Sequence, residues 1–427
     1  MPSRCLIGTA VWAFACITAS AVAIGAPISP DRNPTYLPRP YTIDVNRSRI
    51  EDIRQRASTF SPSLDIDHPA WTDGPPSSEM MCLARYWAEE YDWAAVQSRI
   101  NTEFDHYITT VPAPGENYRI PLDIHFIHQQ SSREDAIPML MLHGWPSTSL
   151  EWERVIPDLV EPKDPSNPAF HIVVPDLPGY GFSPAPTAPG LGPAEHATVF
   201  ASLMQQLGYE RYAVYSTDLG FIVGMSMVAE HGRNIVNHIT DFYLVQPNAT
   251  DVARYSGNKT TAEETRFIES INVFFTAYGA YLTLHSTLPL SVAHALDDSP
   301  VGFLAWVYQL IHTVSDKAYN PSELITQALL LYLPGVYGNI RSYKELFPSL
   351  ASLTAYRAAK PEVPTSVLQF GGFTSYPGIQ ASTYVPRGWV ERSANVTFFA
   401  RHDVGGHFPA LSEPQLLLED IWAIFAQ

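Results

Sequence analysis

Cysteine and basic residues are both scarce in this chain. Its 427 residues include 3 cysteines, and two of them, Cys5 and Cys16, fall in the first thirty residues. A chain that loses this segment keeps Cys82 alone and forms no internal disulfide, so its core must hold the fold. A hydrophobic content of 46% with 12% aromatic residues is enough for such a core. The 26 Lys and Arg residues against 43 Asp and Glu leave a net charge of −17 and no basic stretch for a phosphate backbone, which excludes nucleic acid as a partner.

The first thirty residues differ in kind from the rest. After Arg4 the run from Cys5 to Pro30 carries no charged residue, and it contains the small-residue pattern Ala21-Val22-Ala23. This layout predicts a signal peptide within residues 1–26, and hence a secreted or ER-lumenal protein. A retained anchor in the ER membrane is the alternative, because the run is long enough to span a bilayer. Four sequons fit a secreted glycoprotein and begin at Asn46, Asn248, Asn258 and Asn395.

Short apolar runs that alternate with helical stretches organise the remainder. They predict an α/β fold with a mostly parallel, doubly wound sheet in residues 119–252 and 360–427. Residues 27–118 are expected to be an N-terminal extension packed on this core, and residues 253–359 a helical cap inserted into it. Strands are expected at Leu122–Ile127, Pro138–Leu142, Phe170–Val174, Tyr212–Tyr215, His238–Val245, Thr365–Phe370 and Asn395–Phe399, with helices at His196–Leu207 and Pro414–Phe425.

One turn between a predicted strand and a helix has an acidic centre. In Ser216-Thr217-Asp218-Leu219-Gly220 the small residues Ser216 and Gly220 stand two positions on either side of Asp218. This pattern predicts a strained elbow that exposes the carboxylate. No Gly-x-Ser-x-Gly occurs in the chain, so a serine esterase has no nucleophile here. By itself this turn is a weak signal, because an Asp before a helix is more often simply its N-cap.

Two further motifs support the nucleophile. His143-Gly144-Trp145-Pro146 follows a predicted strand, and the backbone N–H groups of Trp145 and Leu219 can form an oxyanion hole. Gly405-Gly406-His407-Phe408 follows the last strand, and a nucleophile followed by a late histidine is the α/β-hydrolase order. Asp218 and His407 are therefore predicted to act together.

Together these motifs resemble the microsomal-type epoxide hydrolases, including their fungal members. Similar segments include residues 175–183, Pro-Asp-Leu-Pro-Gly-Tyr-Gly-Phe-Ser, and residues 298–306 in the cap, Asp-Ser-Pro-Val-Gly-Phe-Leu-Ala-Trp. The resemblance runs from about Tyr118 to the end and is weaker in the extension. It implies an α/β-hydrolase fold and an apolar epoxide as the small-molecule substrate, with no cofactor. Whether the chain is a monomer or a homodimer stays open.

The resemblance also implies a two-step reaction. Asp218 attacks an epoxide carbon, and His407 then activates water to hydrolyse the ester to a diol. The two cap tyrosines that donate to the epoxide oxygen in this family match Tyr281, six residues before Thr287, and Tyr343, in Ser-Tyr-Lys-Glu. A phenol suits this role because it can protonate the alkoxide as the ring opens.

The chain departs from the family where the acid that orients the histidine should lie. No Asp or Glu occurs between Glu362 and Glu391, and the family position falls on Ile379. The substitutes considered are Asp251, Asp403 and, as a neutral group, Asn248. Related hydrolases can carry the acid after the strand that follows the nucleophile helix, which favours Asp251. The elbow departs too, because Ser216, Thr217 and Phe221 replace smaller residues.

Epoxide hydrolysis is therefore the leading hypothesis. The missing acid raises a second one, an epoxide-opening cyclase or another non-hydrolytic enzyme of secondary metabolism. A non-catalytic binding protein that reuses the cavity is a third. Haloalkane dehalogenation ranks lower, because the tyrosine pair suits an oxygen leaving group. Metal catalysis has no support, since His402 and His407 form no recognised ligand set.

Overall fold

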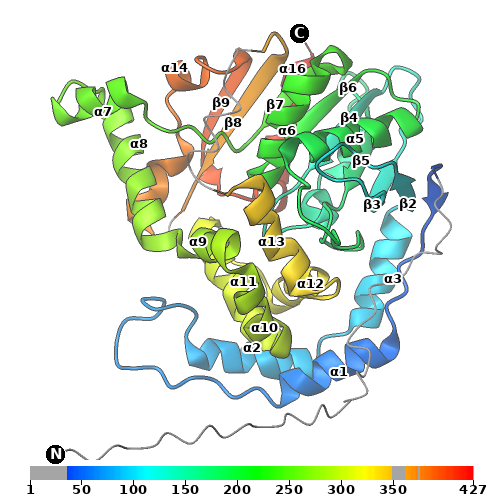
Figure 1. The fold of residues 1–427 in the computed structure, drawn as a ribbon, viewed down its shortest axis with the longest axis vertical. Coiled ribbons are helices and arrows are strands. Elements are labelled where there is room, and N and C mark those ends of the chain that lie inside the picture. Colours follow the sequence, from blue (N-terminus) through cyan, green and yellow to red (C-terminus); the bar gives the residue numbers. More distant parts are fainter. Residues whose placement is uncertain (1–35, 349–360, 374–375, 427) are drawn as a thin grey trace, which may run out of the picture.

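A nine-stranded sheet forms the centre of the molecule (Figure 1). The computed structural model describes residues 36–348, 361–373 and 376–426, so the predicted signal segment lies outside the described residues. The strand order is β1-β2-β3-β5-β4-β6-β7-β8-β9, parallel from β5 to β9 and antiparallel from β1 to β5. The strands are β1 (Arg39–Pro40), β2 (His106–Val111), β3 (Leu122–Gln129), β4 (Ile137–Leu142), β5 (Phe170–Pro175), β6 (Tyr212–Ser216), β7 (Ile235–Thr240), β8 (Pro364–Gly371) and β9 (Asn395–Gly405).

The parallel strands are apolar along most of their length because helices cover both of their faces. In β6 every residue is buried, and α6 (Asp218–His231) packs against it directly. Beside α6 lies α5 (Pro193–Gln206), while α16 (Pro414–Phe425) closes the chain. The α/β-hydrolase architecture predicted from the sequence is confirmed, and α16 has the predicted bounds.

Two strands differ from the prediction in ways that matter. β1 pairs with β2 and β2 pairs with β3, so the extension contributes two strands to the sheet, which the sequence pattern did not predict. The strand expected at His238–Val245 is instead β7, which ends at Thr240. The Thr240 hydroxyl donates to the carbonyl of Phe242 and accepts from its N–H, at 2.8 and 3.2 Å. This local turn takes the chain out of the sheet and leaves Asp241 just beyond the strand's carboxyl end.

Helices form a cap between β7 and β8. Several begin with proline in the first turn, and Asn320 with Glu323 makes a capping box at the start of α12. The cap helices are α7 (Ala249–Ser256), α8 (Ala262–Val273), α9 (Ala280–Thr287), α10 (Pro289–Asp298), α11 (Pro300–Val314), α12 (Pro321–Tyr332) and α13 (Val336–Leu346). Of these, α13 packs on α6 and so lies over the nucleophile helix.

The N-terminal helices cover the cap on the side away from the sheet (Figure 1). They are α1 (Arg47–Ser58) and α2 (Ser77–Glu89), which both pack against α11, whereas α3 (Trp93–Glu103) runs from there toward β2 near the edge of the sheet. The cap is thus held between the extension and the sheet. In the part of the chain that the structure describes, no helix is both long and apolar enough to cross a membrane.

Candidate active site

Asp218 lies at the turn from β6 into α6. Its φ of 47° is left-handed, a conformation that non-glycine residues rarely adopt, and it presents the side chain at the helix N-terminus. The N–H of Trp145 donates to Oδ1 of Asp218 at 2.8 Å, and the N–H of Leu219 also binds the carboxyl group. A Cβ at Gly144 would stand 2.2 Å from this oxygen, so the loop can come this close to Asp218 only because residue 144 is glycine. The structure brings the predicted nucleophile and the two predicted oxyanion-hole donors together.

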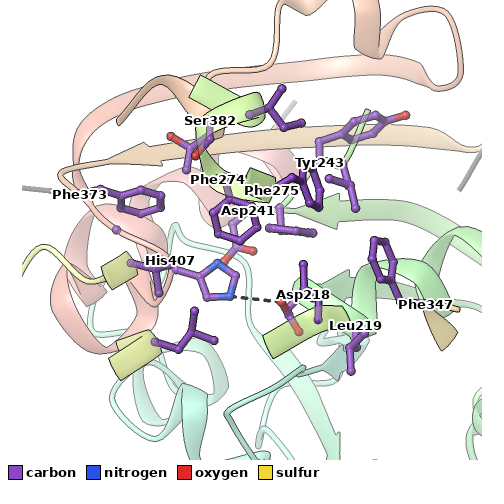
Figure 2. A pocket seen from close by; sticks show the side chains of 18 of the residues that line it. Asp218, Leu219, Asp241, Tyr243, Phe274, Phe275, Phe347, Phe373, Ser382 and His407 are labelled. Atoms are coloured by element: carbon purple, nitrogen blue, oxygen red, sulfur yellow. Dashed lines mark ion pairs between the residues drawn. The ribbon is translucent and has the colours of Figure 1, made fainter. Parts of the chain in front are cut away.

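The two oxygens of the Asp218 carboxyl group have different surroundings. Oδ1 is held by Trp145, while Oδ2 lies 3.7 Å from Nε2 of His407 (Figure 2). Burial raises the pKa of Asp218, and His407 with the N–H groups of Trp145 and Leu219 acts in the opposite direction. A buried carboxylate depends on such partners to stay ionised. Oδ2 is therefore the oxygen placed to react.

His407 sits on a loop that the cap holds in place. Its backbone N–H donates to the carbonyl of Val314 at the end of α11, at 2.9 Å. Gly406 before it has a φ of 62°, and a Cβ there would stand 2.8 Å from that same carbonyl oxygen. The carboxyl group of Asp316 accepts from the N–H of Gly405 at 2.7 Å. The imidazole position therefore depends on the contact between the cap and the end of β9.

Both predicted tyrosines face the same cavity from the cap. Tyr281 on α9 and Tyr343 on α13 have ring centroids 5.9 Å apart, and Trp145 stacks on Tyr281. Burial raises the pKa of each phenol. The charge of Asp218 raises the pKa of Tyr281 further. Tyr281 and Asp218 together raise the pKa of Tyr343 further. Both hydroxyl groups therefore stay protonated and can donate a hydrogen bond across the whole working pH range.

The cavity between cap and sheet is mostly apolar (Figure 2). Besides the nucleophile, histidine and tyrosines, its lining includes Leu219, Ile222, Asp241, Phe242, Tyr243, Leu244, Phe267, Ile271, Phe274, Phe275, Leu282, Leu310, Val314, Phe347, Phe373, Ser382, Thr383 and Gly406. Such a lining selects an apolar molecule and leaves few polar groups to orient it.

The structure contradicts the prediction of Asp251 as the acid. Both of its carboxyl oxygens are bound by Arg392, at 2.6 and 2.9 Å, and one also accepts from the N–H of Asn248. Asn248 itself caps α7 and is exposed. Asp403 is exposed as well and meets the hydroxyl of Tyr384. All three lie outside the cavity lining, and among the described residues none of them forms an ion pair with His407.

Asp241 is the residue that the sequence reasoning missed. It lies just after β7, lines the cavity, and has its carboxyl group beside the imidazole of His407 (Figure 2). The hydroxyl of Tyr215 donates to its Oδ2 at 2.7 Å. Burial raises the pKa of Asp241, while the hydroxyl groups of Thr217 and Tyr215 and the charge of His407 lower it. Asp241 is therefore the carboxyl group placed to stabilise an imidazolium.

The larger residues at the elbow are accommodated without displacing Asp218. Ser216 shares a 2.7 Å hydrogen bond with His238 on β7, and burial lowers the pKa of that histidine to about 4. Phe221 packs on Phe242 with ring centroids 6.1 Å apart. These side chains therefore fill space behind the nucleophile and beside the cavity. Across residues 36–348, 361–373 and 376–426 no cluster of His, Cys, Asp or Glu could hold a metal ion.

Fold and site together define an enzyme of the α/β-hydrolase class with a carboxylate at the nucleophile position. Residues 38–152 match the model of the epoxide hydrolase N terminus, and residues 137–266 match that of the alpha/beta hydrolase fold. Within this class the chain is related to the epoxide hydrolases, so the resemblance inferred from the motifs is confirmed. It extends through the N-terminal extension as well.

Individual relatives match along nearly the whole chain. Epoxide hydrolase 1 of Sus scrofa is 27% identical over 90% of this chain and 87% of its own. Juvenile hormone epoxide hydrolase 1 of Ctenocephalides felis is 25% identical, over 90% of this chain and 84% of its own length. The structure of Aspergillus niger epoxide hydrolase is 26% identical and superposes with a TM-score of 0.78, covering 90% of this chain and 95% of that one.

Proposed function

We propose that this enzyme hydrolyses an apolar epoxide to a vicinal diol through an ester on Asp218. One observation carries the proposal: Asp218, His407, Tyr281 and Tyr343 line a single apolar cavity. The relatives named epoxide hydrolase support the same activity. The missing acid is the reason to consider a cyclase, and Asp241 beside His407, as a candidate for that acid, favours hydrolysis.

In the first step Oδ2 of Asp218 attacks an epoxide carbon and the carbon–oxygen bond of the ring breaks. Tyr281 and Tyr343 hydrogen-bond the departing oxygen, which takes the proton of one of these phenols and becomes a hydroxyl group, leaving a phenolate. Oδ1 stays in the oxyanion hole and becomes the carbonyl oxygen of the ester. The cavity excludes water at this stage, which favours displacement by the carboxylate.

In the second step His407 removes a proton from a water molecule, and the hydroxide adds to the ester carbonyl. Negative charge on Oδ1 is then stabilised by the N–H groups of Trp145 and Leu219. The carboxylate of Asp241 offsets the positive charge of the imidazolium. Collapse expels the diol, whose departing oxygen takes the proton of the imidazolium. The Asp218 carboxylic acid then returns a proton to the phenolate, so Asp218 is again a carboxylate, with one of its oxygens now derived from water.

A single turnover in oxygen-18 water tests this route. Enzyme in excess over a panel of apolar epoxides is expected to give unlabelled diol and to place the label in Asp218, read by peptide mass spectrometry. Labelled diol in the first turnover would mean that water attacks the epoxide directly. A cyclic ether without solvent oxygen would instead support the cyclase.

Tyr343→Phe is expected to slow ester formation by about 10- to 100-fold, because one of two donors to the departing oxygen is lost. Hydrolysis of the ester should stay within a factor of about three, since the phenol has no part in that step. Rapid-quench measurement separates the two rates. Tyr332→Phe is the matched control: it is buried in the cap and its hydroxyl donates to the carbonyl of Asp297. Equal effects of the two variants would count against the donor role.

Asp241→Asn is expected to slow ester hydrolysis by on the order of 10²-fold while ester formation persists, because the imidazolium loses its counter-charge. Lowering the pH through the Asp241 pKa, which burial raises, should have the same effect in the wild type.

Asp403→Asn and Asp251→Asn are the controls, and both should keep wild-type rate constants. Asp251→Asn should still unfold more readily, since it disrupts the pair with Arg392. A slow Asp251 variant with normal stability would reinstate Asp251 as the acid.

We further propose a secretory-pathway location, supported by the uncharged N-terminal run and by sequons at exposed positions. Asn46, Asn248 and Asn258 are exposed, so each is accessible to glycosylation. Expression of the full chain in a secreting host, followed by N-terminal sequencing and glycosidase treatment, tests this. An intact N-terminus in the membrane fraction would favour the anchor.

A further inference from the structure

A buried histidine in the cap has no part in the steps above. His285 lies on α9, one turn after Tyr281, and its side chain is fully buried. Its imidazole contacts three aromatic rings of the active site. The ring centroids lie 4.8 Å from that of Trp145, 5.0 Å from that of Tyr343 and 5.7 Å from that of Tyr281. His285 is not among the residues that line the cavity, so it contacts the phenols from behind.

A hydrogen bond from the indole of Trp306 fixes the orientation of this imidazole. Nε1 of Trp306, on α11, lies 3.0 Å from Nε2 of His285. An indole N–H can only donate, so Nε2 is the acceptor and carries no proton. The proton of the neutral ring is then on Nδ1, which is shielded from solvent and has no hydrogen-bond partner among the described residues. The contact with Trp306 therefore selects one tautomer.

The rings around the imidazole disfavour a second proton. Those of Trp145, Tyr281 and Tyr343 meet it at interplanar angles of 88°, 77° and 63°, so they enclose it edge to face. Burial lowers the pKa of His285 to about 3. A ring that stays neutral and keeps one tautomer holds a fixed orientation, and it offers a constant surface for the side chains that pack on it.

The bond with Trp306 also joins two parts of the active site. At the end of α11 the carbonyl of Val314 accepts from the backbone N–H of His407, so the helix that carries Trp306 also holds the general base. On its other side α9 packs along α13, which carries Tyr343. The position of the phenols relative to the reacting atoms thus depends on where α9 lies against α11. A displacement of about 1 Å can cost about 100-fold in rate, so this support affects ring opening.

We infer that His285 is a positioning residue: its hydrogen bond with Trp306 fixes the ring against which both active-site phenols pack. The phenols are thereby held where they meet the departing oxygen of the epoxide. This role rests on the proposed function, because it acts on the ester-forming step. The state of the imidazole, however, can be tested without any substrate.

Nitrogen-15 NMR of the full-length protein, labelled at histidine, is the first test. The His285 signals are identified by their loss in His285→Gln. Nδ1 should be protonated and Nε2 unprotonated, and both shifts should stay constant from about pH 8 to about pH 5, where an ordinary histidine titrates. A proton on Nε2, or a ring that titrates in this window, would overturn the inference whether or not any epoxide is hydrolysed.

The second test is the rate of each half of the reaction in variants of His285. His285→Phe keeps a flat ring but removes the acceptor, so ester formation should slow about tenfold. His285→Gln can place its carbonyl oxygen near the position of Nε2, so ester formation should stay within about threefold of the wild type. Ester hydrolysis should change by less than about threefold in both, because the phenols act in ring opening.

Two further variants separate positioning from a general effect on the fold. Trp306→Phe removes the same bond from the other side and should slow ester formation equally, and the double variant should slow it no further. His196→Phe is the matched control, since His196 on α5 is also buried and has a ring nitrogen 2.9 Å from the carbonyl oxygen of Gly192. It should lower the melting temperature without changing either rate. Equal slowing of both half reactions in His285→Phe, or equal slowing of ester formation in His285→Phe and His285→Gln, would overturn the inference.

Discussion

Asp218→Ala is expected to abolish ester formation and to reduce turnover by about 10⁴-fold or more, because no other nucleophile can replace the carboxylate. The neighbouring hydroxyl of Ser216 is buried and paired with His238, so it cannot reach an epoxide in the cavity. Rapid quench with a radiolabelled epoxide, followed by digestion, measures the ester directly. The wild type should yield a labelled Asp218 peptide, and the variant none.

Two controls sharpen this prediction. Asp403→Ala removes an exposed aspartate and should leave the label on Asp218 unchanged. Asp218→Asn keeps the shape of the side chain and a residue type that tolerates a left-handed φ, so it separates loss of the nucleophile from loss of the elbow. If Asp218→Ala kept the wild-type function, the chain would be a binding protein that reuses the cavity.

The elbow, the oxyanion loop and the histidine could be predicted because each follows a short apolar strand. β4 and β6 are largely buried and β9 is a partly buried edge strand, but all three contain apolar runs, and the parallel order then places their carboxyl ends together. Asp218, Trp145 and His407 follow three different strands; the structure brings Asp218 and His407 to one cavity, and the N–H of Trp145 donates to Asp218 there. The tyrosines came from the resemblance alone, since the helical cap has no comparable pattern.

The acid could not be found in the same way because the strand before it was predicted too long. A strand through Val245 places Asp241 in its middle, where an aspartate would be a sheet residue with no role. The structure ends β7 at Thr240, whose hydroxyl starts a turn through Phe242. Element ends are set by such local hydrogen bonds, which hydrophobic pattern does not encode. The Asp251 assignment followed from this error of five residues.

His407→Gln is expected to separate the two halves of the reaction. Ester formation should continue, since Asp218 and the tyrosines are untouched, but ester hydrolysis should slow by about 10³- to 10⁴-fold for want of a base. The glutamine is close in size and cannot take a proton from water. Mixing variant and epoxide should therefore release almost no diol, while mass spectrometry finds Asp218 fully esterified.

This result bears on every competing mechanism at once. Continued release of diol would mean that water reaches the substrate without passing through the ester. Continued release of a cyclic ether would mean that a substrate hydroxyl, not His407-bound water, completes the reaction. A stable ester instead places the histidine after the attack by Asp218, and it supplies the starting material for measuring how Asp241 sets the pH dependence of hydrolysis. Adding the Asp241→Asn change to His407→Gln should then slow hydrolysis no further, because a carboxylate that acts through an imidazolium has nothing to stabilise once the imidazole is gone.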